Sequence, residues 1–321
     1  MCYNQTIRFG GGKMVAFLIV TAVILLILAG LYASYYKVFY SPKKDISETK
    51  NPPAIERLAY GKRVSERINE VNTTPCKFYT IRSYDGLKLS ARYFEGDDDK
   101  PLCICFHGYR GSAVRDFAGI GLHLIHEGYN VLIVDERAHW RSQGHTICFG
   151  IKERFDAVSW VKFANQRFGK DKSIFLFGIS MGGGTVLMAS GQRLPRNVKG
   201  IVADCPFNSP KDIIKHVCRK IKLNPDLLWP VIWLAGLVYG RLRVNATTAA
   251  DEVKRSKVPI VILHGEADDF VPMSMSKEVQ KANPSMIEMH TFPHADHGMS
   301  YFEDEERYIG IVEGFIEKNN N

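Results

Sequence analysis

The chain has 321 residues, of which 45% are hydrophobic and 24% carry a charge. This composition is typical of a globular protein and excludes a mainly disordered chain. The net charge is +8, but no zinc-finger spacing, RNA-binding signature or interleaved basic and aromatic stretch accompanies it, so we predict no nucleic-acid partner. The seven cysteines include no CxxC pair, which argues against a structural zinc site and against a disulfide framework.

A long apolar segment follows a short N-terminal tail, residues 1–13. Residues 14–36 contain no charged side chain, and about 20 apolar residues are enough for a helix to cross a bilayer. We therefore predict a single-pass membrane anchor over residues 14–36. A cleaved signal peptide is the alternative, because Arg8 and Lys13 precede the segment; the apolar part of such a peptide usually has about 7–15 residues.

Basic residues flank the anchor on both sides, Arg8 and Lys13 before it and Lys37, Lys43 and Lys44 after it. The short basic tail before a long domain favours a domain on the extracytoplasmic side. Residues 37–72 are polar and include SPKKD and NPPAIE. They predict a stem between the membrane and a domain formed by residues 73–321.

The domain alternates strand-like and helix-like segments. Residues 77–94 place Asp85-Gly86 between two alternating runs, which predicts an antiparallel hairpin. Further strands are predicted at residues 102–106, 130–134, 173–177, 198–203, 259–263 and 287–292. All but the last are near-continuous apolar runs, as expected of strands buried on both faces. Because helical patterns lie between them, we predict an α/β fold with a mainly parallel sheet covered by helices.

One predicted strand runs directly into GISMG, residues 178–182, and then into a helical pattern. This matches the GxSxG nucleophile elbow, in which a serine occupies a sharp strand-to-helix turn with its hydroxyl exposed. Gly178 and Gly182 supply the small neighbours that such a turn needs, and the helix N-terminus favours developing negative charge. We therefore predict that Ser180 is a nucleophile. A chance serine in a glycine-rich turn is the alternative.

Five blocks in order, HGYRGS, DERAHWRSQG, GISMGG, HGEADDFVP and PHADHGMS, resemble the α/β-hydrolase superfamily. The resemblance covers residues 77–317. It is greatest to membrane-anchored bacterial serine hydrolases related to dienelactone-hydrolase and prolyl-oligopeptidase-type domains. It implies an α/β-hydrolase fold with a helical cap inserted after strand 6, at residues 206–257. The second block departs from the family at Ala138, His139 and Trp140, and we interpret it as structural support for the site.

The resemblance also implies the partners of Ser180. Asp268 matches the acid position of the family and His297 its base, in the order Ser…Asp…His expected for this fold. Asp269 and Asp204 are alternative acids, and His294 is an alternative base.

The same resemblance implies an oxyanion hole formed by the backbone N–H groups of Tyr109 and Met181. No cofactor is expected. No metal is expected either, because neither an HExxH motif nor a third ligand accompanies His294 and His297.

The predicted cap contains the apolar run LLWPVIWLAGLVYG, residues 227–240, which is too short to span a bilayer. Basic residues precede this run, namely Lys211, Lys215, Arg219, Lys220 and Lys222. Three roles remain open. The run lines an acyl or aromatic pocket, rests with its basic neighbours on an anionic membrane, or packs only on the core.

These features predict a serine hydrolase that cleaves a carboxylic ester of a small-molecule or lipid acyl substrate through an acyl-enzyme. A peptide bond is less favoured, because nothing indicates the propeller domain of oligopeptidase relatives. The alternatives are a peptidase-like enzyme, a hydrolase of lipids in its own membrane, and a non-catalytic binding protein. The sequence specifies no particular substrate or oligomeric state, since one fold hosts many chemistries.

Overall fold

The computed structural model describes residues 11–42 and 60–320, and its centre is one eight-stranded sheet of order β1-β2-β4-β3-β5-β6-β7-β8. The strands are β1 (Lys77–Arg82), β2 (Lys88–Phe94), β3 (Leu102–Phe106), β4 (Asn130–Val134), β5 (Ile174–Ile179), β6 (Val198–Asp204), β7 (Ile260–Gly265) and β8 (Ile287–Phe292). β2 pairs antiparallel with β1 and β4, and the other neighbours are parallel. The predicted fold class is confirmed.

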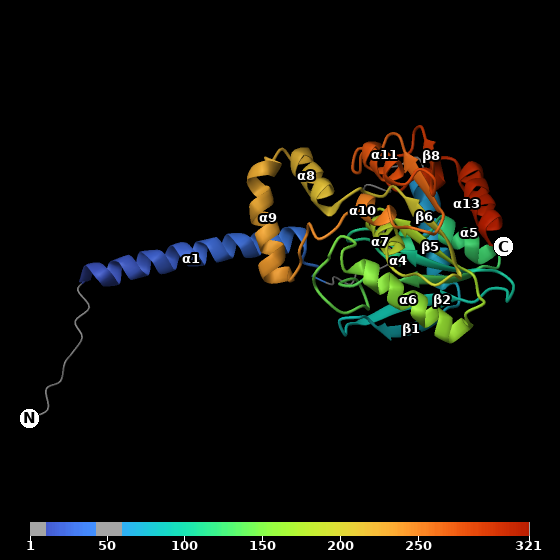
Figure 1. Ribbon diagram of the computed structural model, residues 1–321, viewed down its shortest axis with the longest axis horizontal. Helices are drawn as coiled ribbons and strands as arrows, with labels where there is room; N and C mark the ends of the chain where they lie inside the picture. Colours follow the sequence, from blue (N-terminus) through green and yellow to red (C-terminus); the bar gives the residue numbers. More distant parts are fainter. Residues whose placement is uncertain (1–10, 43–59, 321) are drawn as a thin grey trace, which may run out of the picture.

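Helices cover both faces of this sheet, and other helices stand away from it (Figure 1). They are α1 (Gly11–Val38), α3 (Gly61–Thr73), α4 (Ala113–Asp116), α5 (Ile120–His126), α6 (Glu153–Phe168), α7 (Met181–Ser190), α8 (Pro210–Lys220), α9 (Pro225–Gly240), α10 (Ala249–Val253), α11 (Met273–Ala282), α12 (Ser300–Glu303) and α13 (Glu305–Asn319). Buried side chains of α6, α7, α10 and α11 join one core cluster, and those of α3, α4, α5, α12 and α13 join the other. Successive residues of β3 alternate between the two clusters, because side chains along a strand point to opposite faces.

The predicted stem is wrong for residues 61–72. They belong to helix α3, which lies against the domain with Val64, Ile68 and Val71 buried. These three positions share one helical face at i, i+4 and i+7, and Arg67 on the same helix pairs with Glu305 of α13. The polar composition concealed this narrow apolar stripe. At the other end of the predicted stem, residues 37–38 belong to helix α1, and Phe39 and Ser41 are buried. Residues 43–59 lie outside the described part of the chain.

Helix α1 projects from the domain as a long rod (Figure 1), and it is long and apolar enough to cross a membrane. Its side chains are largely exposed between Met14 and Leu28. The end nearest the domain is different, because Leu31 and Tyr35 are buried and Phe39, just beyond the helix, is fully enclosed. Helix α1 is therefore packed onto the domain at that end.

The cap lies between β6 and β7 and contains α8, α9 and α10. α8 and α9 stand away from the sheet, and α9 runs across α1 where α1 meets the domain (Figure 1). Gly236 of α9 faces the ring of Phe39, and a Cβ atom there would lie 3.3 Å from that ring. The cap insertion after strand 6 is thus confirmed.

Among the described glycines, Gly182 of α7 leaves the least room for a side chain, because it lies against the end of β3. A Cβ atom on Gly182 would lie 1.8 Å from the carbonyl oxygen of Phe106, whereas one on Gly310 in α13 would meet nothing within 4 Å. Gly182→Ala must displace backbone, at a cost of about 3 kcal/mol, which lowers the melting temperature by roughly 6–12 °C. Gly310→Ala gains about 0.5–1 kcal/mol from helix propensity. Thermal unfolding of the full chain in detergent tests the pair, and equal melting temperatures would contradict the packing described.

Candidate active site

Ser180 occupies the turn between β5 and α7 with φ +56° and ψ −112°, a conformation that L-residues rarely adopt. Two glycines make the turn possible. A Cβ atom on Gly178 would lie 2.2 Å from the carbonyl oxygen of Gly182, and Gly182 has no room for one either. The backbone N–H of Ser180 donates to the carbonyl of Asp204 on β6 at 2.8 Å. The turn is thus fixed on both sides, with the hydroxyl at the carboxyl edge of the sheet.

His297 and Asp268 come from the loops after β8 and β7, and they meet Ser180 at this edge. Nε2 of His297 lies 2.8 Å from Oγ of Ser180, and Nδ1 lies 2.7 Å from Oδ2 of Asp268. The other carboxylate oxygen of Asp268 accepts the backbone N–H groups of Phe270 and Val271 at 2.9 and 2.8 Å. The three predicted side chains are therefore brought together in one hydrogen-bonded chain.

The carboxylate of Asp268 is held in its charged form. Burial alone would raise its pKa, but His264 beside it, the bond with His297 and the N–H of Val271 lower the pKa well below its usual value. His264 is itself fixed by Ser276 and the carbonyl of Val271, at 2.7 and 2.9 Å. No pattern in the sequence indicates this role of His264, although the residue opens the HGEADDFVP block.

The alternative residues lie elsewhere. Asp269 is exposed and accepts a bond from Lys220 at 2.7 Å, and His294 is exposed on the loop before His297. Asp204 is buried, and its two carboxylate oxygens accept hydrogen bonds from Ser300 and Tyr308, at 3.4 and 3.1 Å. None of the three side chains has a hydrogen bond to the side chain of Ser180 or of His297 in the described part of the chain.

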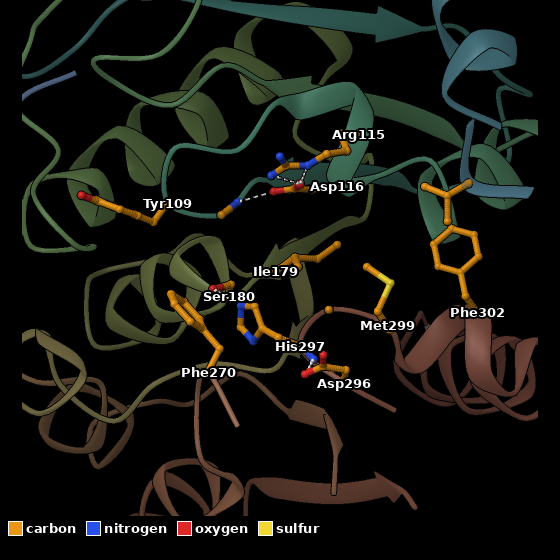
Figure 2. Close-up of a pocket in the computed structure, with 13 residues that line it drawn as sticks. Tyr109, Arg115, Asp116, Ile179, Ser180, Phe270, Asp296, His297, Met299 and Phe302 are labelled. Carbon is orange, nitrogen blue, oxygen red and sulfur yellow. Dashed lines mark hydrogen bonds and ion pairs between the residues drawn. The ribbon is translucent and has the colours of Figure 1, made fainter. Parts of the chain in front are cut away.

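The loop after β3, which carries Tyr109, passes next to Ser180. A Cβ atom on Gly108 would lie 3.4 Å from Cβ of Ser180. The N–H of Gly108 donates to Oδ2 of Asp116 at 2.7 Å, and Arg115 pairs with the same carboxylate (Figure 2). Tyr109 and Met181, the first residue of α7, line one cavity together with Ser180. N–H groups in the first turn of a helix lack acceptors within that helix, so the Met181 N–H is available to a bound anion.

Two buried histidines form hydrogen bonds to the backbone of the same loop. Nδ1–H of His107 donates to the carbonyl of Gly108 at 2.9 Å, and Nε2 of His139 accepts the N–H of Arg110 at 3.2 Å. Burial, with His107 beside it, lowers the pKa of His139 to about 3, so its imidazole is neutral and can accept. This agrees with the interpretation of the DERAHWRSQG block as support.

The loop is also attached to helix α1. The hydroxyl of Tyr109 donates to the carbonyl of Val38 at 2.8 Å. The guanidinium of Arg110 donates to the carbonyls of Lys37 and Tyr40, each at 3.0 Å. These carbonyls are among those left without intrahelical partners where a helix ends. No pattern in the sequence predicts this contact, because residues 37–40 and 109–110 are distant along the chain.

Ser180 lies at the junction of two cavities. The first, about 290 Å³, contains the charged or polar side chains of Arg115, Asp116, Asp296 and His297 (Figure 2). Apolar side chains line it too, namely Val64, Ile179, Phe270, Met299 and Phe302. The second, about 280 Å³, is lined mainly by apolar side chains of the cap, by Phe149 and by the end of α1. We call them the polar lobe and the apolar lobe. Tyr109 and Phe270 line both lobes, and the ring of Phe270 lies 5.0 Å from that of His297.

The described residues include one group that could approach a metal ion, Cys205 with Asp268 and His297. Both imidazole nitrogens of His297 already lie at hydrogen-bond distance from Asp268 and Ser180. Burial also raises the pKa of the Cys205 thiol well above its usual value, whereas a metal ligand must be a thiolate. The residues present therefore fit a proton-transfer chain better than a metal site.

The buried carboxyl of Asp204 makes a pH-dependent prediction. Burial raises its pKa from 3.8 to about 6, so the folded chain binds more protons than the unfolded chain between those pH values. The protonated carboxyl of Asp204 therefore stabilises the fold below pH 4. About 3 kcal/mol of the free energy of unfolding is lost as the pH rises through 6. Asp204→Asn should therefore be more stable than the wild type at pH 7.5 and similar at pH 4, as measured by calorimetry. Equal stabilities of the variant and the wild type at both pH values would contradict the prediction.

The chain is similar in sequence to several known proteins. Residues 97–254 match the family model described as "Serine aminopeptidase, S33". A Bacillus subtilis protein, YqkD, whose function is uncharacterised, is 24% identical over 94% of this chain and 96% of its own length. Caffeoylshikimate esterase of Arabidopsis thaliana is 30% identical over 43% of this chain and 46% of its own length.

Solved structures show the same architecture. An esterase from Pyrococcus furiosus superposes with a TM-score of 0.64 at 22% identity, covering 78% of this chain and 94% of its own. Est1E of Butyrivibrio proteoclasticus, solved with ferulic acid bound, superposes with a TM-score of 0.59 at 22% identity. The match covers 75% of this chain and 98% of Est1E. The chain therefore has the fold of the α/β-hydrolases, and residues 97–254 match a hydrolase family model.

Proposed function

We propose that this protein is a serine hydrolase that cleaves a carboxylic ester through an acyl-enzyme on Ser180. The observation that carries the proposal is the unbroken hydrogen-bonded chain from Asp268 through His297 to Ser180, with distances of 2.7 and 2.8 Å. In such a chain the carboxylate fixes the tautomer of the imidazole and stabilises its protonated form. The other imidazole nitrogen then accepts the serine proton.

The reaction follows from these contacts. His297 takes the hydroxyl proton of Ser180 while Oγ of Ser180 bonds to the carbonyl carbon of the ester. The N–H groups of Tyr109 and Met181 bind the resulting oxyanion. The N-terminus of α7 adds its positive dipole end. His297 gives the proton to the departing alcohol, leaving the acyl group on Ser180. A water molecule, deprotonated by His297, then releases the carboxylic acid and restores the serine.

An ester is favoured over a peptide by the contents of the polar lobe. The matching family model is described as a serine aminopeptidase, and such an enzyme needs an anion for the free ammonium group of its substrate. Asp116 in this lobe is already bound by Arg115 and by the N–H of Gly108. Asp296 is exposed and accepts the backbone N–H of His297 with one oxygen at 2.7 Å, so the choice rests on the pairing of Asp116. A protein of similar fold and a relative in sequence are both esterases by name, which supports the same choice.

We also propose that α1 anchors the enzyme in a membrane, with the domain on the extracytoplasmic side. The exposed apolar surface of α1 supports the anchor, and the short basic tail supports the orientation. In intact cells expressing the full chain, externally added protease should degrade the domain. Protection of the domain until the cells are lysed would contradict the orientation and leave the anchor in place.

The chemical proposal is tested by labelling the full chain in detergent with a fluorophosphonate. We expect wild type to label, and Ser180→Ala, His297→Ala and Asp268→Asn to label at least a hundredfold more slowly, because each breaks the proton chain. His294→Ala and Asp269→Asn are matched controls that replace the same residue types next to the site, and they should label at the wild-type rate. A folded wild type that does not label would overturn the proposal.

A further inference from the structure

The two lobes differ in their relation to His297, and this difference assigns a part of the substrate to each. His297 lines the polar lobe and does not line the apolar lobe, whereas Met181 lines only the apolar lobe. The departing alcohol must reach His297 to receive its proton. The acyl chain must then extend to the other side of Ser180. The alcohol therefore belongs in the polar lobe and the acyl chain in the apolar lobe.

We propose that the substrate is a membrane lipid ester whose acyl chain enters the apolar lobe directly from the bilayer. This inference rests on the proposed hydrolase function and names its substrate class. Its support is the chemistry of the lobe, the attachment of the lobe to α1, and the surface that the cap presents beside α1.

The apolar lobe has the lining of an acyl-chain site. Its walls include Phe149, Phe207, Ile214, Val217 and Ile221. At the ~30 Å³ that a water molecule occupies in the liquid, its volume of about 280 Å³ holds on the order of nine groups of that size. A saturated acyl chain of medium length satisfies both the volume and the apolar lining, and burial of each methylene contributes about 0.8 kcal/mol.

The end of α1 forms part of this lobe. Lys37 and Val38 line it, and the bonds from Tyr109 and Arg110 to the last carbonyls of α1 fix that end against the site. The lobe therefore lies at the level where the membrane helix leaves the bilayer.

Tyrosines mark this level. Tyr32, Tyr35 and Tyr36 lie on the last turns of α1, and the ring of Tyr239 on α9 packs 5.4 Å from that of Tyr32. The hydroxyl of Tyr239 donates to the carbonyl of Leu28 at 3.1 Å. Tyrosine side chains gather at the head-group depth of membranes, where one end is apolar and the other wet. The head groups should thus meet α1 where α9 crosses it.

Helix α9 presents an apolar surface at the same place. Leu227, Val231, Leu234 and Val238 are exposed along one side of it, and α9 runs across the end of α1 (Figure 1). A helix lying across a membrane-spanning helix runs along the membrane surface, where such a stripe can enter the head-group region. Exposed basic residues flank the stripe, namely Arg219, Lys222, Arg241 and Arg243. Their charge matches anionic lipids.

The first experiment measures acyl-chain preference with soluble esters. For the full chain in detergent, kcat/KM for p-nitrophenyl octanoate should exceed that for p-nitrophenyl acetate at least tenfold. Val217→Phe fills the lobe and should lower this ratio at least tenfold. Arg219→Phe places the same ring on the same helix but outside the lobe, and the ratio should change less than twofold. No chain preference in a wild type that labels with fluorophosphonate would overturn the inference and leave the proposed function intact.

The second experiment tests the bilayer as the source of the substrate. The full chain is placed in vesicles of ether-linked phosphatidylcholine and phosphatidylglycerol, in which didecanoylglycerol is the only ester, and released decanoic acid is measured. We expect release by wild type. The ratio of this rate to p-nitrophenyl octanoate hydrolysis should fall at least fivefold in Leu227→Ser/Leu234→Ser/Val238→Ser.

Phe78→Ser/Tyr84→Ser is the matched control, because it removes exposed apolar side chains remote from α9 and should leave that ratio unchanged. Cleavage of p-nitrophenyl octanoate without release of decanoic acid would show that the acyl chain comes from a soluble ester. This result would overturn the inference. Absence of both activities together with absence of labelling would instead overturn the proposed function.

Discussion

The left-handed turn at Ser180 is the constraint on which the site depends. A serine at φ +56° is strained, and the strain persists because the surrounding chain leaves no alternative path. Gly178, near the end of β5, lies against the backbone of α7 at Gly182, and Gly182 in the first turn of α7 lies against the end of β3. The parallel pairing of β5 with β3 and β6 then brings the loops after those strands to the hydroxyl.

The loop that carries Tyr109 is held from three directions. His107 and His139 form hydrogen bonds to its backbone, and Asp116 accepts the N–H of Gly108. Carbonyl groups at the end of α1 accept hydrogen bonds from the side chains of Tyr109 and Arg110. An oxyanion hole is effective only when its donors are positioned before the reaction. The end of α1 therefore helps to position the loop beside Ser180. On the proposal that α1 spans a membrane, a change in its position there would act directly on this loop.

The sequence predicted the sheet well, because strands buried on both faces are continuous apolar runs that end at glycine or polar residues. Three of the predicted strands, residues 102–106, 130–134 and 287–292, have the observed bounds. It also named the residues that meet at Ser180, since the order of the motifs along the chain resembles that of a known superfamily. Helix α3 was missed because three buried positions among polar neighbours gave too weak a pattern. The contact of Arg110 with α1 was missed because it joins segments far apart in sequence.

The central claim is that Ser180 carries the acyl group during turnover. The direct measurement is mass spectrometry of peptides from the full chain, mixed with p-nitrophenyl octanoate and quenched in acid within the first turnover. The account predicts an octanoyl group on the peptide that contains Ser180, and its loss as turnover proceeds. Release of nitrophenol with no acyl group on that peptide, or with the acyl group on another residue, would contradict it.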